Sequence, residues 1–208
     1  DDVLIGLRYA ERLLDGKGLT WNDGTRVEGY SNLLWVLAAA SLGALSADLV
    51  SAARVLSALS VFACLAALIF AGARHRDPLA AGMGALGLAC SGGAAAWMLA
   101  GFEHPGLAAL VTWAMVLLSG SLGERGCRPS RLAAPGLLLA LATLTRADAI
   151  GLTGAIGLGW FLAHGLSIAS LKSTTILMTP SVLALIGQTG FRLIYYGAWL
   201  PNTALVKV

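Results

Sequence analysis

Charged residues divide the chain into long uncharged stretches separated by short polar clusters. After Glu28 the uncharged stretches cover residues 33–45, 55–73, 78–102, 104–123, 132–145, 149–171 and 173–190. A helix that crosses the hydrocarbon core of a bilayer needs roughly 20 mainly apolar residues, with about 17 as the lower limit. Most of these stretches are long enough, but the first is too short and 132–145 is borderline. The pattern predicts an all-α, polytopic helical membrane protein.

The short stretch at 33–45 decides the expected topology. If it lies at the membrane interface, about six crossings follow, over residues 48–73, 78–99, 104–118, 132–145, 150–165 and 171–193. The two most basic short loops, 74–77 and 124–131, then share one side, which the positive-inside rule makes cytoplasmic. If 33–45 did span, residues 1–31 would instead be cytoplasmic. We expect the interfacial arrangement.

With this topology the remaining polar segments gather on the external side. They are residues 1–2, 21–32, 101–105, 145–148 and 192–207. Segments that lie far apart in sequence would thus meet on one surface, which predicts a site built from helix ends and loops. The corresponding division is an external loop with two juxtamembrane helices at 1–47, a transmembrane bundle at 48–194 and the start of another external loop at 195–208.

The composition supports a membrane protein. Of the 208 residues, 57% are apolar and only 12% are charged, about half the charged share of soluble domains. Such a chain is neither a water-soluble globular domain nor a disordered one. The net charge of +3 fits loops at a membrane face and does not indicate nucleic-acid binding.

The first segment reads as two interfacial helices joined by a polar loop. Apolar residues recur with a 3.6-residue period on one face of the first helix, and charged residues on another; the apolar face holds Val3, Leu7, Ala10 and Leu14. Gly16 and Gly18 are expected to end this helix. Ser31 is expected to cap the short second one.

Each candidate functional residue also has an ordinary structural interpretation. Asp1 and Asp2 are either helix caps or a catalytic carboxylate. Glu103 is either a surface acid or an acid that is paired or faces a wet cavity, and His104 beside it reads as a loop residue. Arg146 and Asp148 form either a helix-ending ion pair or, through the arginine, a phosphate site.

The other polar, glycine and cysteine positions favour structural interpretations. Arg192 with Tyr195, Tyr196 and Trp199 fits an interfacial aromatic belt. Glycines within the apolar stretches are expected to permit close helix contact; they are Gly82, Gly84, Gly87, Gly92, Gly93, Gly151, Gly154, Gly157 and Gly159. The cysteines show no CxxC or Cys/His spacing, so the sequence indicates neither a metal site nor a disulfide framework.

Four of these motifs, taken in order, resemble elements of the GT-C membrane glycosyltransferases. Residues 1–35 resemble the first external loop of that family, and Gly101-Phe102-Glu103 is similar to its Gly-Leu/Met-Glu element. Thr145-Arg146-Ala147-Asp148 resembles its Arg-Pro-Asp element, and residues 195–203 resemble its Tyr-Tyr-Gly and Leu-Pro-Asn-Thr elements. The nearest relatives by these motifs are the terminal arabinofuranosyltransferases of actinobacterial cell walls and their bacterial homologues.

This sequence departs from the family pattern at two positions. His104 stands where the family commonly has Thr, and Ala147 stands where it commonly has Pro. The resemblance also implies that the chain is a piece of a longer protein, with a transmembrane helix before Asp1 and further helices after Val208.

The resemblance implies transfer of a sugar from a polyprenyl-phosphate donor to a hydroxyl of a glycan, lipid or protein acceptor. The reaction would occur on the periplasmic face of a bacterial inner membrane. An acid of the first loop would act as base, and we expect Asp1 in this role, with Asp2 as the second candidate. Displacement would invert the anomeric carbon, because the acceptor attacks directly.

The remaining roles follow from charge. Arginines and lysine would stabilise the leaving phosphate, and the expected ligands are Arg146, Arg192 and Lys207. Sugar or acceptor hydroxyls would be bound by Glu28, Glu103, His104, Asp148, Tyr196 and Asn202. For Glu103 and Asp148 the alternative role is to hold those arginines. The expected partners are membrane lipid, the lipid-linked donor and the acceptor. The scheme requires no metal, although acids beside a phosphate could bind a divalent ion.

Two other functions fit parts of the sequence. A transporter or lipid flippase would also have glycine-rich helices and intramembrane charges, but it predicts polar residues near helix centres, whereas the charges here sit at helix ends. A structural membrane subunit would need no external acid cluster. Transfer of a labelled sugar would separate these alternatives.

Overall fold

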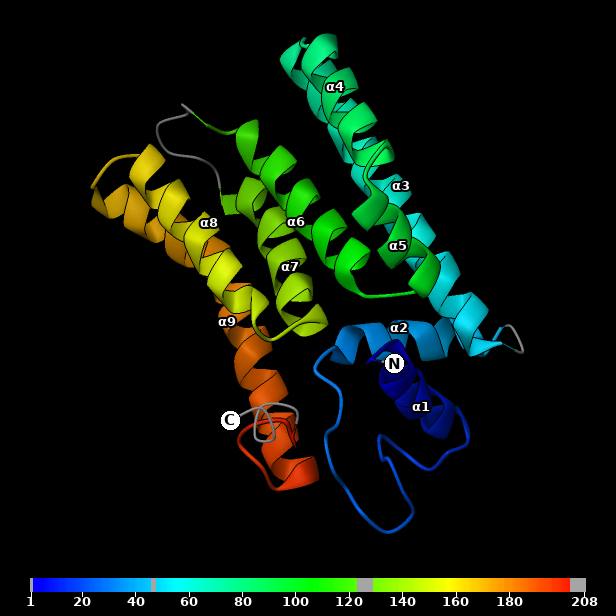
Figure 1. Ribbon diagram of the computed structural model, residues 1–208. Helices are drawn as coiled ribbons and strands as arrows, with labels where there is room; N and C mark the ends of the chain where they lie inside the picture. Colours follow the sequence, from blue (N-terminus) through cyan, green and yellow to red (C-terminus); the bar gives the residue numbers. More distant parts are fainter. Residues whose placement is uncertain (1, 46–47, 123–128, 203–208) are drawn as a thin grey trace.

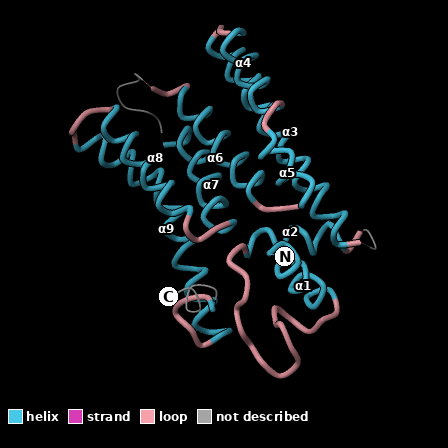
Figure 2. Tube along the Cα trace, viewed as in Figure 1, coloured by secondary structure: helices cyan, strands magenta, loops and turns pink. Residues whose placement is uncertain are grey.

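The computed structural model describes residues 2–45, 48–122 and 129–202, and every regular element in these parts is a helix (Figures 1 and 2). The predicted all-α class is therefore confirmed for the described chain. The helices are α1 (Asp2–Leu14), α2 (Leu33–Gly43), α3 (Leu49–His75), α4 (Pro78–Ala89), α5 (Gly92–Ala100), α6 (His104–Ser119), α7 (Pro129–Thr145), α8 (Ala149–Ala163) and α9 (Ile168–Tyr196).

Two of the described helices, α3 and α9, are long and apolar enough to cross a membrane. The pair α4 and α5 makes a third candidate if it counts as one broken span. The helices α6, α7 and α8 occupy three further predicted crossings, but they have only 16, 17 and 15 residues. The described part of the chain thus has two to three helices of spanning length, as expected for a membrane protein, and six crossings stay a prediction.

The predicted crossing at 78–99 is not one straight helix. It bends by 56° between α4 and α5, where the backbone N–H of Ala94 donates to the Ser91 side chain. This bond caps a new helix at Ser91, and such local side-chain bonds compete with the regular backbone ladder. Serine followed by Gly92 and Gly93 therefore breaks the apolar run, although its hydropathy is continuous.

The first segment folds as predicted into two short helices that pack together and lie across one end of the bundle (Figure 1). Gly16 and Gly18, both with positive φ, follow the end of α1. With 11 residues, α2 is about 16 Å long, which is too short to cross the hydrocarbon core alone. Its N-cap is Asn32, without a side-chain cap bond, so the predicted Ser31 cap is wrong.

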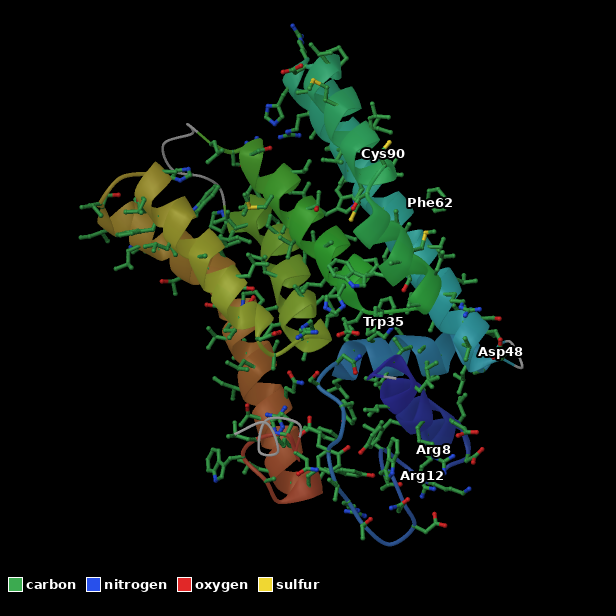
Figure 3. All side chains as sticks on the ribbon, viewed as in Figure 1. Arg8, Arg12, Trp35, Asp48, Phe62 and Cys90 are labelled. Atoms are coloured by element: carbon green, nitrogen blue, oxygen red, sulfur yellow. The ribbon has the colours of Figure 1, made fainter. Side chains whose placement is uncertain are left out.

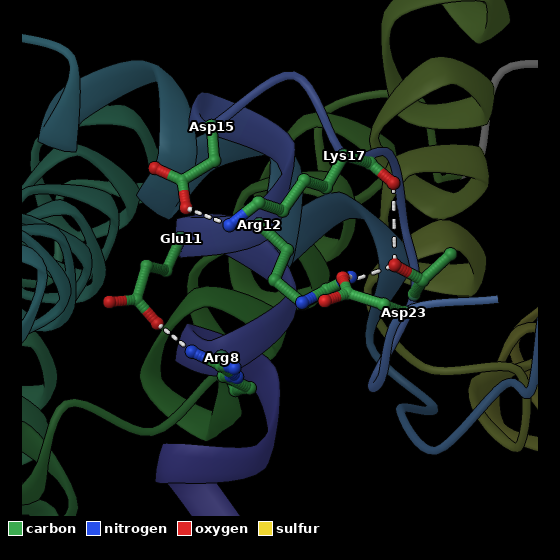
Figure 4. A network of polar contacts seen from close by, with 7 residues as sticks. Arg8, Glu11, Arg12, Asp15, Lys17 and Asp23 are labelled. Atoms are coloured by element: carbon green, nitrogen blue, oxygen red, sulfur yellow. Dashed lines mark hydrogen bonds and ion pairs between the residues drawn. The ribbon is translucent and has the colours of Figure 1, made fainter. Parts of the chain in front are cut away.

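Polar contacts fix the loop after α1 (Figure 4). The buried Arg12 guanidinium donates from Nε to Thr20 Oγ1 at 2.9 Å and from Nη2 to Asp23 Oδ1 at 2.5 Å. The same hydrogen bond lowers the pKa of the Asp23 carboxyl below its ordinary value. Arg8 and Glu11 pair on the exposed face of α1. These charges hold the first segment together and lie apart from the candidate site.

The bundle itself is held by α3 with α6, α6 with α7, and α7 with α9. The contact of α7 with α9 depends on Gly136, where a Cβ would lie 2.9 Å from the Leu177 carbonyl oxygen of α9. Among the glycines predicted to permit close contact, only Gly157 is tight, against Met178. Gly84 makes ordinary contact with Leu68, and Gly93 touches only Ser91.

The other glycines in that prediction face open space, because a Cβ added to any of them would meet no atom within 4 Å. The prediction is therefore wrong for Gly82, Gly87, Gly92, Gly151, Gly154 and Gly159. The reason is that these glycines lie on outward helix faces, where lipid is the expected neighbour and a small side chain brings no second helix closer.

Candidate active site at one end of the bundle

Glu103 is the centre of a polar cluster at the junction of α5 and α6. Gly101 ends α5 with φ +80°, and a Cβ there would lie 3.1 Å from that of Ala53. The chain therefore turns tightly and carries Glu103 inward, where it is only 6% exposed. Trp35 of α2 donates from Nε1 to the Gly101 carbonyl at 3.2 Å, which fixes this turn against α2 (Figure 3).

Two side chains from distant segments donate to the Glu103 carboxylate. Asn32 donates from Nδ2 to Oε2 at 3.2 Å, and Arg146 donates from Nη1 to Oε1 at 2.9 Å. The loop before α2, the start of α6 and the end of α7 therefore meet at one carboxylate. A buried acid with two such donors is held in one orientation.

Arg146 also forms a two-pronged pair with Asp148. Its Nε donates to Oδ1 at 3.0 Å and its Nη2 to Oδ2 at 2.9 Å. This pairing lowers the pKa of Asp148 and, with the charge of Glu103, raises the pKa of Arg146. The side chains are 27% exposed for Arg146 and 68% for Asp148. Three of the five guanidinium N–H groups donate to carboxylates and a second one on Nη1 lies 3.4 Å from His104 Nε2, so one N–H group on Nη2 is left to receive an anion.

His104 borders the same cluster. Its ring stacks on Trp97 at 4.8 Å between centroids, and its Nε2 lies 3.4 Å from Arg146 Nη1. The buried Nδ1 has no hydrogen-bond partner among the described residues. His104 is the first residue of α6, and its ring lies beside the Arg146 guanidinium.

A second carboxylate–arginine pair lies deeper, between the first loop and α9. Arg192 donates from Nη2 to Glu28 Oε1 at 3.1 Å and from Nε to Oε2, and the two side chains are 6% and 4% exposed. Arg192 also donates to the Trp199 carbonyl at 3.4 Å. The Asn202 backbone N–H donates to the Glu28 carbonyl at 3.0 Å. The predicted phosphate ligand Arg192 and the predicted sugar ligand Glu28 therefore satisfy each other.

Tyrosines join the first loop to α9. Tyr196 donates from its hydroxyl to the Leu19 carbonyl at 2.8 Å, and its hydroxyl oxygen lies 3.2 Å from the Tyr30 hydroxyl. Tyr9 of α1 donates to the Val27 carbonyl and accepts from the Gly29 N–H. Burial raises the pKa of the phenols of Tyr9 and Tyr30 above the ordinary value. Tyr196, predicted as a sugar ligand, is thus part of this core.

A narrow pocket lies beside Glu103, under the first turns of α1. Its volume as a cavity is about 0 Å³, so it is a close-packed crevice and not a cavity of the roughly 300–1,000 Å³ typical of small-molecule sites. Its lining is Val3, Gly6, Leu7, Asn32, Trp35, Val36, Ala39, Gly101 and Glu103. The pocket thus brings the beginning of α1 next to the Glu103 carboxylate.

Of the two residues predicted as the base, the structure describes only the backbone of Asp2. Asp2 is the first residue of α1, one residue before Val3 of the pocket, and its side chain is not described. Asp1 and Lys207 lie outside the described residues. Within the described ranges, no group of three His, Cys, Asp or Glu side chains is arranged to hold a metal ion.

Sequence reasoning missed two residues of this cluster, Asn32 and Trp35. Asn32 could have been noticed in the sequence, because it is a polar residue directly before an apolar helix. A polar residue at that position is ordinarily interpreted as a helix cap and not as part of a site. In the sequence, Trp35 is only one of several apolar residues in the segment that forms α2. Nothing in the sequence indicates that its Nε1–H donates to the Gly101 carbonyl. The chain matches no family model, no curated protein and no solved structure.

Proposed function

We propose that the protein is a GT-C type membrane glycosyltransferase that moves a sugar from a polyprenyl-phosphate donor to an acceptor hydroxyl. The observation that supports this most is the Glu103 carboxylate, which Asn32 and Arg146 hold beside the pocket at the start of α1. Three motifs of the family resemblance contribute to this one cluster. The proposed location is the external face of a bacterial inner membrane, with six crossings.

Arg146 is the proposed phosphate ligand. Its fork is oriented by Glu103 and Asp148, and its remaining N–H group on Nη2 can donate to a phosphate oxygen. Arg192 is less suited to this role, because its side chain is only 6% exposed and lies against the equally buried Glu28. Lys207 remains a proposed second ligand.

The proposed step is a direct displacement. Asp1 or Asp2 removes the proton of the acceptor hydroxyl, and the oxygen attacks the anomeric carbon. The bond from that carbon to the phosphate oxygen breaks, and polyprenyl phosphate leaves with the electron pair. The negative charge that develops on the leaving oxygen is stabilised by Arg146.

An open groove on α9 offers a place for the isoprenoid chain. Its volume is about 380 Å³, and its lining is Thr174, Thr175, Met178, Thr179, Val182 and Leu183. The threonine hydroxyls 175 and 179 donate to carbonyls of their own helix, so the groove presents mainly apolar surface.

The test is transfer of a radiolabelled sugar from polyprenyl-phosphate donors by the full-length protein in lipid nanodiscs. Asp1→Asn or Asp2→Asn is expected to slow transfer at least ~100-fold, because a general base contributes about 10²–10⁴. Glu11→Gln, an exposed acid on the same helix, is the matched control and should keep full transfer. Full transfer by both aspartate variants would contradict the assignment of the base. Lipid flipping without transfer by the wild type would favour a flippase.

A further inference from the structure

Gln188 of α9 is a buried amide that the proposed mechanism does not use. The residue is 4% exposed, and neither Oε1 nor Nε2 has a hydrogen-bond partner among the described residues. Burying an amide without partners is unfavourable, because it loses its bonds to water. A residue kept at this cost is a candidate for binding a ligand.

The position of Gln188 points it towards the candidate site. It precedes Arg192 by one helical turn, and residues four apart share a helix face. Arg192 reaches Glu28 of the first loop from this face, so Gln188 lies on the side of α9 that faces the loop and the bundle.

The register of α7 and α9 gives the height of Gln188 in the bundle. Gly136 of α7 lies against Leu177 and Pro180 of α9, and both helices run in the same direction (Figure 1). Nine residues further on, α7 ends at Thr145, and α9 reaches Gln188 eight residues after Pro180 and eleven after Leu177. Gln188 therefore lies level with the end of α7, where Arg146 begins its cluster with Glu103.

The chemistry of the amide selects the class of ligand. A phosphate has only acceptor oxygens at the ester end of the donor and would satisfy Nε2 alone. A pair of sugar hydroxyls can accept from Nε2 and donate to Oε1 together. We infer that Gln188 binds two hydroxyl groups of the donor sugar and so contributes to the choice of sugar. The inference rests on the proposed function.

The test compares two ligands on the full-length protein in nanodiscs, by thermal unfolding and by binding. The ligands are polyprenyl phosphate and a polyprenyl-phosphate arabinofuranose or mannose. In Gln188→Met, a variant of similar volume, the Kd for the sugar-bearing lipid should rise about tenfold, since two net hydrogen bonds are lost. The Kd for polyprenyl phosphate should change less than about twofold, because the phosphate ligands are intact.

The ligand-free protein gives a second readout. Removing an unpaired buried amide should raise the apparent Tm by about 2–4 °C. Ser181→Ala is the matched control, because Ser181 is also buried and unpartnered among the described residues but lies about 10 Å away along α9. It should leave both Kd values unchanged.

The outcomes separate the inference from the proposed function. If the wild type binds the sugar-bearing lipid and Gln188→Met binds it equally well, Gln188 does not contact the sugar, although the function stands. A lower Tm in ligand-free Gln188→Met would mean that the amide is bonded to ordered water and has a structural role, which overturns the inference. If the wild type binds neither lipid, the proposed function and the inference both fail.

Discussion

The same end of the bundle holds two pairs of carboxylate and arginine that differ in their access to solvent. Glu28 and Arg192 are both almost completely buried and bind each other through two hydrogen bonds. Arg146 binds Glu103 and Asp148 but stays about a quarter exposed. The buried pair joins the first loop to α9, whereas the open cluster leaves one exposed guanidinium N–H group for an anion. Charge identity alone therefore does not indicate function; exposure and unused donors do.

The largest expected effect is on the buried pair. Glu28→Ala leaves the Arg192 guanidinium buried without its counter-charge, and such changes cost about 3–5 kcal/mol. We expect the apparent Tm of the purified protein to fall by roughly 6 °C or more. The measurement is thermal unfolding of the full-length protein in nanodiscs.

A double variant provides the control for the buried pair. Glu28→Leu combined with Arg192→Met removes both charges and keeps apolar volume, which is often neutral or stabilising. Its Tm should recover most of the loss seen with Glu28→Ala. If the double variant is as unstable as Glu28→Ala, the pair must stabilise the protein by more than the mutual neutralisation of its two charges.

The next effect is at Gly29, where the first loop touches Tyr9. A Cβ at this position would lie 2.9 Å from the Tyr9 hydroxyl oxygen, which is bonded to Val27 and to Gly29 itself. Gly29→Ala should therefore destabilise by about 1–3 kcal/mol through overpacking. Gly151→Ala is the control: it lies in α8 with no atom within 4 Å, so it should stabilise by about 0.5–1 kcal/mol. Equal Tm changes in the two variants would contradict the close contact at Gly29.

A smaller effect concerns pH and the open cluster. The pKa of Asp148 is lowered by Arg146, so its contribution to stability is present above the ordinary aspartate pKa of about 3.9 and is lost as pH falls through the lowered value. The Tm difference between wild type and Asp148→Asn should thus be constant from pH 7 to about pH 4.5. A difference that disappears at pH 5–6 would mean that Arg146 does not hold this carboxylate.

The smallest effect is at the exposed pair on α1. Arg8 and Glu11 lie 2.6 Å apart, with side chains 44% and 51% exposed, and such pairs contribute about 0.2–1 kcal/mol. Arg8→Gln should change the Tm by about 1–2 °C at most. If Arg8→Gln lowered the Tm as much as Glu28→Ala does, burial would not decide how much an ion pair contributes to the stability of this protein.

The sequence predicted well those features that depend on local pattern. The end of α1 at Gly16, the shortness of α2 and the all-helical class follow from periodicity, glycine and the length of apolar runs. The meeting of Glu103 with Arg146 was expected from topology, because both follow crossings that end on the same side. This expectation depends only on the even number of predicted crossings between the two residues, and not on how the helices pack.

Features that depend on distant packing were beyond the sequence. Glu28 and Arg192 are 164 positions apart, and Arg192 was interpreted as a belt residue or a phosphate ligand, because no local signal names its partner. The kink at Ser91 is a local hydrogen bond that hydropathy does not register. The glycines of α4 and α8 looked like contact residues, but composition does not reveal which helix face turns outward.

The most direct measurement compares transfer by Arg146→Lys with transfer by the double variant Glu28→Leu and Arg192→Met. Lysine keeps the charge but not the fork that binds two carboxylates and an anion. Rates of labelled sugar transfer from polyprenyl-phosphate donors, taken per folded protein, should fall about 10²–10³-fold in Arg146→Lys and stay within a few-fold of wild type in the double variant. Full transfer by Arg146→Lys, with loss confined to the double variant, would contradict the assignment of the open cluster as the active site.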